Sequence, residues 1–204
     1  MFTVFFATSN PGKQQEVKRF AEQYSEKFHL SFPDQSNSVV VEETGQTFEE
    51  NALLKARAYQ KIAAPDAIVV GDDSGLKIPA LNNEPGIFSR RWAGHEMTDQ
   101  EIVDYCLQKM TGLTGDDRKA VFETTLVALS GTAEPRIYRG EMWGHILEKP
   151  AGPITAPGFP YRPLFWVDGL DCSLSDFDTM SVQDRKGFLN HRERAFKALF
   201  ESLV

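Results

Sequence analysis

Two adjacent aspartates, Asp72 and Asp73, are the residues of this chain whose type and setting point most directly to chemistry. Within residues 68–75 they end a short apolar run and are followed by a Ser-Gly turn signal, which would place them at the carboxyl end of the run. A short run rich in β-branched residues that ends in Gly and Asp predicts a buried strand, and open α/β sheets place ligands at the carboxyl ends of such strands. Two neighbouring carboxylates repel each other unless a cation or a proton separates them. The pair therefore indicates a metal-using enzyme; the alternative is a plain turn, which Asp and Gly favour on their own.

A second polar segment follows the predicted first strand, residues 2–7. It reads Thr8, Ser9, Asn10, Pro11, Gly12, Lys13. Backbone N–H groups at a helix start attract phosphate, and a lysine adds a point charge. The spacing is not that of a P-loop, so the alternative is an ordinary helix start with a lysine that faces solvent.

Carboxylates upstream of the aspartates offer metal ligands. Glu50 has a structural duty as the N3 residue of a capping box, whereas Glu42 and Glu43 have none. Mg²⁺ takes oxygen ligands, typically one or two carboxylates with phosphates and water, and Glu42 with Asp73 would meet that need. Asn51 and Lys55 are one helical turn apart and could point together into a cleft.

Two later segments could contact a base or an anion. The first is Phe159, Pro160, Tyr161, Arg162 and Pro163, whose aromatic faces could stack on a base; packing of a proline-rich loop is the alternative. The second is Lys186 with the later Asn190-His191-Arg192. Basic residues in the first turn of a helix oppose its dipole, which indicates an anion-binding or base-recognition role unless that turn is simply solvated.

Composition limits the function classes. The chain has 204 residues, 41% of them hydrophobic and 25% charged, and a formal net charge of -7. This acidic balance argues against a general nucleic-acid-binding surface. The two cysteines are too few for a disulfide scaffold, and no signal peptide or membrane span is predicted. We therefore expect a cytoplasmic protein with no nucleic-acid or membrane partner.

Strands and helices alternate early in the chain, and paired strands dominate its middle, which favours an α/β fold with a mixed sheet. The predicted strands are residues 2–7, 39–41, 68–71, 76–78 (a hairpin partner of 68–71), 120–130, 136–147 and 164–167. The predicted helices are residues 14–24, 48–63, 99–110 and 191–203, and the long loops are residues 82–94 and 150–163.

In this order, the segments resemble the inosine triphosphate pyrophosphatase family. The most specific parts are residues 8–13, 42–55, 72–75 and Pro85-Gly86-Ile87-Phe88-Ser89. The resemblance covers nearly the whole chain. It implies one domain over residues 1–204, with a mixed elongated sheet and flanking helices that form two lobes around a nucleotide cleft, and a homodimer.

The resemblance also implies an activity, the Mg²⁺-dependent hydrolysis of non-standard purine nucleoside triphosphates (ITP, dITP, XTP) to the monophosphate and pyrophosphate. Glu42 and Asp73 would hold Mg²⁺, with Asp72 in support. Asp73 would also accept the proton of the attacking water; because a metal-bound carboxylate is a poor base, Asp72 or a hydroxide held by the metal could share that role. The implied substrate-binding residues are Thr8, Ser9, Asn10, Pro11, Gly12, Lys13, Lys55, Ser74, Phe159, Pro160, Tyr161, Arg162, Lys186, His191 and Arg192. Among them, residues 8–13 would cradle the triphosphate, and His191 and Arg192 would contact the keto edge of the purine.

The chain departs from the family at its base-contacting loop. The family usually has Phe-Gly-Tyr-Asp-Pro, where this chain has Pro160 in place of Gly and Arg162 in place of Asp. Arginine cannot accept a hydrogen bond, although it could donate to a keto oxygen, stack on a base or hold a phosphate. The family's Ser-His-Arg is also changed, to Asn190-His191-Arg192. We therefore expect intact phosphate and metal chemistry with a base preference that differs from ITP and XTP.

Two other function classes stay open at this stage. One is a nucleotide-binding or sensing protein with weak catalysis, for which Arg162 is the argument. The other is a different Mg²⁺ phosphohydrolase, acting on modified pyrimidine nucleotides or on a monophosphate. The product, pyrophosphate or orthophosphate, would separate the last case.

Overall fold

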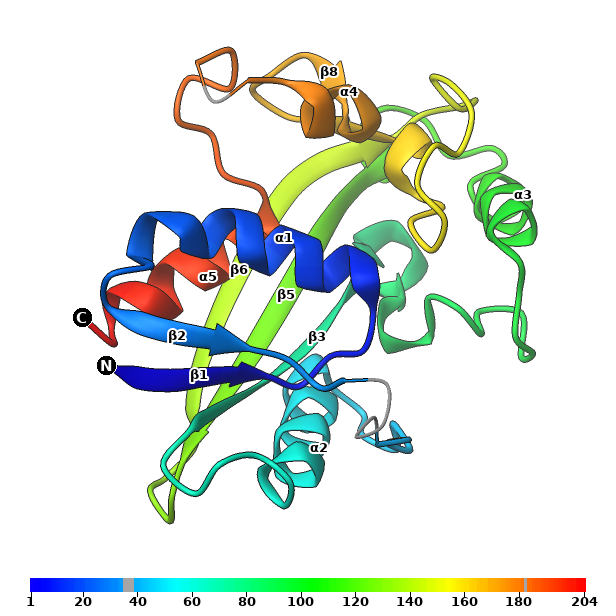
Figure 1. Ribbon diagram of the computed structural model, residues 1–204. Helices are drawn as coiled ribbons and strands as arrows, with labels where there is room; N and C mark the ends of the chain where they lie inside the picture. Colours follow the sequence, from blue (N-terminus) through cyan, green and yellow to red (C-terminus); the bar gives the residue numbers. More distant parts are fainter. Residues whose placement is uncertain (35–38, 182) are drawn as a thin grey trace. The chain divides into compact units, whose positions relative to one another are not determined.

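The computed structural model describes residues 1–34, 39–181 and 183–204, and its architecture is mixed α/β (Figure 1). The strands form one eight-stranded sheet in the order β2-β1-β3-β5-β6-β7-β8, with β4 paired to β3. The first three strands in this order pair in parallel, and the pairs β3–β4, β6–β7 and β7–β8 are antiparallel. The predicted mixed sheet with flanking helices is thus confirmed.

The strands are β1 Phe2–Phe6, β2 Phe28–Ser31, β3 Ile68–Ile78, β4 Glu84–Pro85, β5 Lys119–Ser130, β6 Arg136–Ile146, β7 Phe165–Val167 and β8 Cys172–Ser173. The α-helices are α1 Pro11–Ala21, α2 Phe48–Gln60, α3 Asp99–Lys109, α4 Leu174–Thr179 and α5 His191–Glu201. Short 3₁₀ helices span Glu22–Tyr24, Pro79–Leu81, Gly86–Phe88, Gly115–Arg118 and Arg162–Leu164.

The chain divides into two compact units, and β3, β5 and β6 each contribute residues to both. Unit 1 comprises Met1–Ser74, Thr124–Gly140 and His191–Val204; unit 2 comprises Gly75–Glu123 and Glu141–Asn190.

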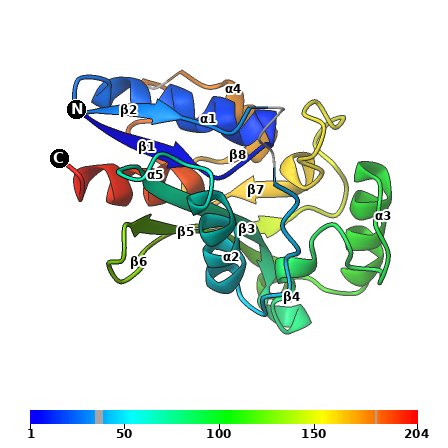
Figure 2. The same ribbon diagram turned by 60° about the horizontal axis from the view of Figure 1, so that its bottom comes forward.

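Unit 1 has three layers because its strands are apolar on both faces. Val4 and Val70 pack with α1 and α5 on one face, in a cluster rich in phenylalanine. Phe5 and Val69, one position away in each strand, pack with α2 on the other face. Figure 2 shows α2 beside β3. Since successive strand residues point to opposite faces, this alternation determines which helices the later residues of β3 meet.

Capping residues hold the starts of α1 and α2; α2 begins at residue 48 as predicted, but α1 begins at Pro11 instead of at the predicted residue 14. The Asn10 side chain accepts hydrogen bonds from the backbone N–H groups of Gly12 and Lys13, and Pro11 occupies the first turn of α1. Thr47 caps α2 by accepting from the N–H of Glu50. Such caps satisfy donors that the helix itself cannot, so the starts of both helices are fixed locally.

Unit 2 has its own core, formed by the remaining parts of the long strands with β7, α3 and α4. Arg118 lies within it and donates to the backbone carbonyls of Met110, Leu113, Ile146 and Leu147. These bonds tie the end of α3 to the end of β6. They also supply partners for a guanidinium that would be costly to bury alone.

Several predicted element bounds are wrong. Residues 39–41 form no strand, and the predicted hairpin of residues 68–71 with 76–78 is instead one continuous strand, β3. Both aspartates are ion-paired, so the strand can continue through them. The elements β2, β4, β8 and α4 have no counterpart in the sequence-based prediction, because each is short and stabilised by packing against its neighbours.

Across the described residues, no helix has both the length and the apolar character needed to cross a lipid bilayer.

Candidate active site

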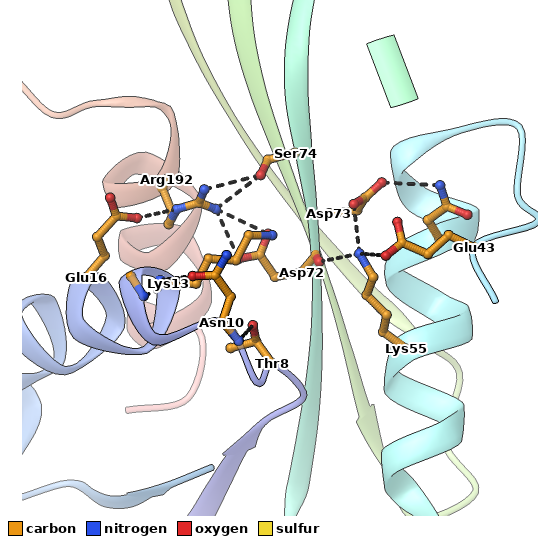
Figure 3. Close-up of polar contacts among 12 residues, drawn as sticks. Thr8, Asn10, Lys13, Glu16, Glu43, Lys55, Asp72, Asp73, Ser74 and Arg192 are labelled. Atoms are coloured by element: carbon orange, nitrogen blue, oxygen red, sulfur yellow. Dashed lines mark hydrogen bonds and ion pairs between the residues drawn. The ribbon is translucent and has the colours of Figure 1, made fainter. Parts of the chain in front are cut away.

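Asp72 and Asp73 lie within β3 rather than at its end, and they point to opposite faces of the sheet (Figure 3). Asp72 shares the face of Val70, toward α1 and α5, and Asp73 shares the face of Val69, toward α2. Both are buried, at 2% and 7% exposure. The repulsion expected between adjacent carboxylates is therefore relieved by strand geometry, and each carboxylate has cationic partners of its own.

The Asp72 carboxylate is held by two cations. Lys13 Nζ of α1 lies 3.1 Å from its Oδ1, and Arg192 of α5 donates to its Oδ2 at 3.0 Å. The same guanidinium donates to Ser74 Oγ at 3.2 Å, and its Nε donates to Glu16 Oε2 at 2.6 Å. Arg192, only 4% exposed, thus joins α1, β3 and α5 through three protein partners.

This environment changes two pKa values. Burial opposes ionisation of Asp72, but the charges of Arg192 and Lys13 outweigh it and lower the pKa of Asp72 to about 2. Burial also lowers the pKa of Lys13, and Asp72 offsets that effect only in part. Asp72 is thus a stable anion at neutral pH.

The Asp73 carboxylate faces α2. Its Oδ1 accepts from Lys55 Nζ at 2.8 Å, and its Oδ2 accepts from the Asn51 amide at 3.3 Å. Lys55 Nζ also lies 3.0 Å from Glu43 Oε1. Burial raises the pKa of Asp73 against the attraction of Lys55. Burial lowers the pKa of Lys55, but Asp73 and Glu43 outweigh it and raise that pKa. Asp73 is thus the more basic of the two aspartates.

The donor set around Lys55 fits a hard divalent cation. Its ammonium group bridges Asp73 and Glu43, so two carboxylates already converge on one positive charge. In the described part of the chain, no three or more His, Cys, Asp or Glu residues group as a metal cage. Mg²⁺ commonly binds through one or two carboxylates plus substrate phosphates and water. Both candidate glutamates are exposed; Glu43 is the one whose carboxylate lies beside Lys55, and the Glu42 carbonyl accepts from Thr44 N.

The loop before α1 carries the predicted phosphate ligands. Thr8 Oγ1 accepts from Asn10 N at 3.2 Å, and the Thr8 carbonyl accepts from Gln14 Nε2 at 2.9 Å. Because Asn10 caps the N–H groups of Gly12 and Lys13, the loop is ordered by its own side chains. Ser9 and Pro11 are exposed beside it. Lys13 thus connects this loop directly to Asp72.

The predicted base-contacting residues 159–162 and Lys186 belong to unit 2. Tyr161 is 5% exposed and packs in the core of that unit, and Pro160 is buried as well. Phe159 keeps a partly exposed ring, and Arg162 lies over it. Lys186 is exposed, with a positive φ of 49°. Of the two aromatic faces expected for a base, only that of Phe159 reaches the surface.

Glu16 and Asp178, which pair with predicted site residues, were not identified from the sequence. Glu16 lies three residues after Lys13 on α1, so the helical period could have indicated it. Asp178, the ion-pair partner of Arg162 at 2.9 Å, gives no sequence signal. His191 is half-buried at the start of α5, and the neighbouring Arg192 points to Asp72 instead of to solvent.

Comparison with known proteins shows which family the chain resembles over its full length. The chain is 39% identical over 208 residues to a dITP/XTP pyrophosphatase of Bacillus cereus, an alignment that covers 100% of this chain and 95% of that protein. It is 36% identical to a dITP/XTP pyrophosphatase of Thermoanaerobacter pseudethanolicus, over 96% of this chain and 93% of that one.

Solved structures give the same result. The Staphylococcus aureus Ham1 protein superposes with a TM-score of 0.79 at 33% identity, covering 98% of this chain and 97% of that one. A HAM1 protein from Coxiella burnetii gives a TM-score of 0.81 at 30% identity, covering 100% and 98%. The sequence model of the Ham1 family matches residues 4–202 of this chain. With fold, sequence and structural relatives in agreement over the full length, the chain belongs to the Ham1 family.

Proposed function

We propose that this protein is a nucleoside triphosphate pyrophosphatase that hydrolyses non-standard purine nucleotides (XTP, dITP, ITP) to the monophosphate and pyrophosphate. The observation that carries the proposal is the buried charged centre on β3, in a chain that aligns end to end with relatives named dITP/XTP pyrophosphatases. The strand carries two buried aspartates, each paired with a lysine. Charged residues are rarely buried for structural reasons alone. Such groups suit phosphoryl transfer, which depends on positioning and charge neutralisation.

In this proposal Lys13 and the loop of residues 8–12 bind the triphosphate. Lys13 is held beside that loop by Asp72, and its ammonium would neutralise charge on the phosphate oxygens. Arg192, which also donates to Ser74, keeps Asp72 in place. Asp72 therefore acts by orienting cations, which its low pKa supports.

Asp73 is the proposed proton acceptor. The oxygen of a water molecule adds to the α-phosphorus, the bond from that phosphorus to the α–β bridging oxygen breaks, and the electron pair leaves with pyrophosphate. The water proton passes to a carboxylate, and Asp73 is favoured because burial raises its pKa. Lys55 and Asn51 hold the two oxygens of Asp73 in a fixed orientation.

Asp73 and one carboxylate of the Glu42–Glu43 pair are the proposed ligands of Mg²⁺. When bound, the ion would supply charge neutralisation on the bridging phosphate oxygens. The contact of Glu43 with Lys55 favours Glu43, whereas the family resemblance favours Glu42. Comparison of Glu42→Gln with Glu43→Gln decides between them: the ligand is the residue whose loss raises the Mg²⁺ concentration needed for half-maximal activity.

As the family resemblance implies, Phe159 is the proposed stacking surface for the base and Lys186 is a proposed polar contact, both in unit 2.

A substrate panel tests the proposal. Purified protein with Mg²⁺ is given XTP, ITP, dITP and the standard triphosphates, and both pyrophosphate and orthophosphate are measured. We expect pyrophosphate release from the non-standard purine nucleotides, at rates well above those for ATP and GTP. Tight nucleotide binding without turnover would instead identify a binding or sensing protein, and orthophosphate as the direct product would identify another phosphohydrolase.

A further inference from the structure

We propose that Asn51 is a positioning residue that couples the acidic loop, residues 42–46, to Asp73, because the two ends of its side-chain amide bind one segment each. The inference deepens the proposed function and rests on it, since the acidic loop carries Glu42 and Glu43 and Asp73 is the proposed proton acceptor. All of these residues belong to unit 1. One neutral side chain of α2 thus sets the spacing between the carboxylates of two separate segments.

Both ends of the Asn51 amide have a partner. Its Oδ1 accepts from the backbone N–H of Gly45 at 2.9 Å, and its Nδ2 donates to Asp73 Oδ2 at 3.3 Å. Asn51 is only 1% exposed, so water does not take the place of either partner. The opposite orientation of the amide would set N–H against N–H and a carbonyl oxygen against a carboxylate. Only one orientation therefore satisfies both contacts, and it ties the loop to the strand.

Gly45 is the point where the acidic loop approaches α2. An added Cβ there would lie 2.6 Å from Asn51 Oδ1 and 2.7 Å from the Cβ of Glu50. Only a residue without a side chain brings its N–H this close to the helix. The next N–H, that of Gln46, donates to Glu50 Oε2 at 2.6 Å. Two consecutive backbone N–H groups of the loop are thus bound by side chains of the first turn of α2.

Lys55 forms a second link between the same two segments (Figure 3). It lies one helical turn after Asn51, on the same side of α2. This link is ionic, and the Glu43 side chain is 38% exposed, so solvent and salt weaken it. A charged phosphate or cation would also compete for its members, whereas the Asn51 contacts are neutral at one end and buried. We therefore assign to Asn51 the spacing that persists when charged ligands bind.

Kinetics test whether this spacing matters for the reaction. Both kcat and KM for XTP are measured in the wild type and in Asn51→Ala. We expect kcat to fall about tenfold or more, as for the loss of a hydrogen bond to a charged group, with KM within a few-fold, because the phosphate-binding loop is untouched. Gln60→Ala is the matched control: the Gln60 amide is also on α2 and donates to the Gly131 carbonyl at 3.0 Å. Both of its constants should equal those of the wild type.

Hydrogen exchange of the Gly45 amide, followed by NMR in the metal-free protein, tests the loop end of the link. We expect this amide to be protected in the wild type and to exchange about tenfold faster or more in Asn51→Ala, because it loses its acceptor. Asn51→Asp separates the two ends. It keeps an acceptor for Gly45 but presents no amide donor to Asp73, so at neutral pH the protection should remain while kcat falls.

Unchanged Gly45 exchange in Asn51→Ala, or a kcat of that variant equal to the wild-type value, would overturn the inference while leaving the pyrophosphatase proposal standing. If the wild type releases no pyrophosphate from any nucleotide, the proposed function fails, and the exchange measurement is joined by a stability cycle of Asn51→Ala with Asp73→Ala. The Tm of the double variant should then fall by less than the sum of the two single falls, because both changes remove the same bond. Additive falls would overturn the coupling.

Discussion

At the scale of single residues, Asp72 and Asp73 show how one peptide bond separates two electrostatic environments. Asp72 is surrounded by Lys13 and Arg192, and its pKa is lowered to about 2. Asp73 has Lys55 on one oxygen and a neutral amide on the other, and burial raises its pKa. The two carboxylates therefore suit different tasks, a permanent anion and a proton acceptor.

Replacing Asp73 by Asn should nearly abolish turnover while the fold is retained. Asn is isosteric but cannot accept the water proton or offer an anionic ligand to a metal, and losing such a group costs roughly a hundredfold or more in kcat. Pyrophosphate release and thermal unfolding are measured together. Asp66→Asn, at an exposed position, is the control. Activity within a few-fold of the wild type would mean that Asp73 is not in the reacting centre.

The low pKa of Asp72 predicts a pH-dependent contribution to stability. Its folded-state pKa of about 2 lies below the ordinary value of 3.8, so its ion pairs stabilise the fold above that ordinary value and are lost as pH falls toward the folded-state value. The shift corresponds to about 2 kcal/mol at neutral pH.

The measurement is the unfolding free energy of the wild type and of Asp72→Asn between about pH 7 and pH 2. We expect the wild type to be more stable by a constant margin down to about pH 5 and the margin to shrink below it. A margin that persists at the acid end of the range would contradict the ion-pair assignment.

At the scale of elements, β3 is the scaffold of the site, and the helices on its two faces bring the cations. Lys13 and Arg192 come from α1 and α5, and Lys55 comes from α2. The strand and α2 approach each other closely at Gly71, where an added Cβ would lie 1.9 Å from the carbonyl oxygen of Ala52. This glycine lets α2 lie against the strand just before the aspartates.

Gly71→Ala should therefore destabilise the protein and reduce its activity together. The methyl group must push α2 away from β3, which costs about 1–3 kcal/mol and moves Lys55 and Asn51 away from Asp73. Gly152→Ala is the matched control, because an added Cβ there meets nothing within 4 Å. Unfolding midpoints and kcat are compared for both. Equal kcat values in the two variants would show that the position of α2 is not critical for the site.

At the scale of the whole molecule, the proposed need for Mg²⁺ in catalysis is separable from the stability of the fold, since Lys55 and Asn51 are protein partners of Asp73. Removing divalent ions with EDTA should therefore abolish turnover with little change in Tm, and added Mg²⁺ should restore activity. Unfolding on EDTA treatment would instead indicate a structural metal. The homodimer expected from the sequence stays a prediction that light scattering can check.

Local sequence patterns predicted much of this protein. Caps at Thr47 and Thr98 located the starts of α2 and α3, since a cap depends only on residues within one turn, whereas α1 begins at Pro11 and not at the predicted residue 14. The order of the polar segments indicated the family. The pattern around Asp72 and Asp73 indicated that these aspartates belong to the site. The predicted pairing of Glu42 with Asp73 stays a prediction, while the structure brings Glu43 to Lys55.

Long-range packing decided the rest. No sequence period shows that β3 continues through its aspartates, because what permits this is the arrival of Lys13, Lys55 and Arg192 from three helices. For the same reason the sequence could mark Arg162 as unusual but could not indicate its partner Asp178. The sequence by itself thus determined the residue types, the starts of α2, α3 and α5, and the class of chemistry. Which face each carboxylate points to, and which charge stands beside it, was decided only by the tertiary structure, because ion pairs between distant segments form only when their elements pack.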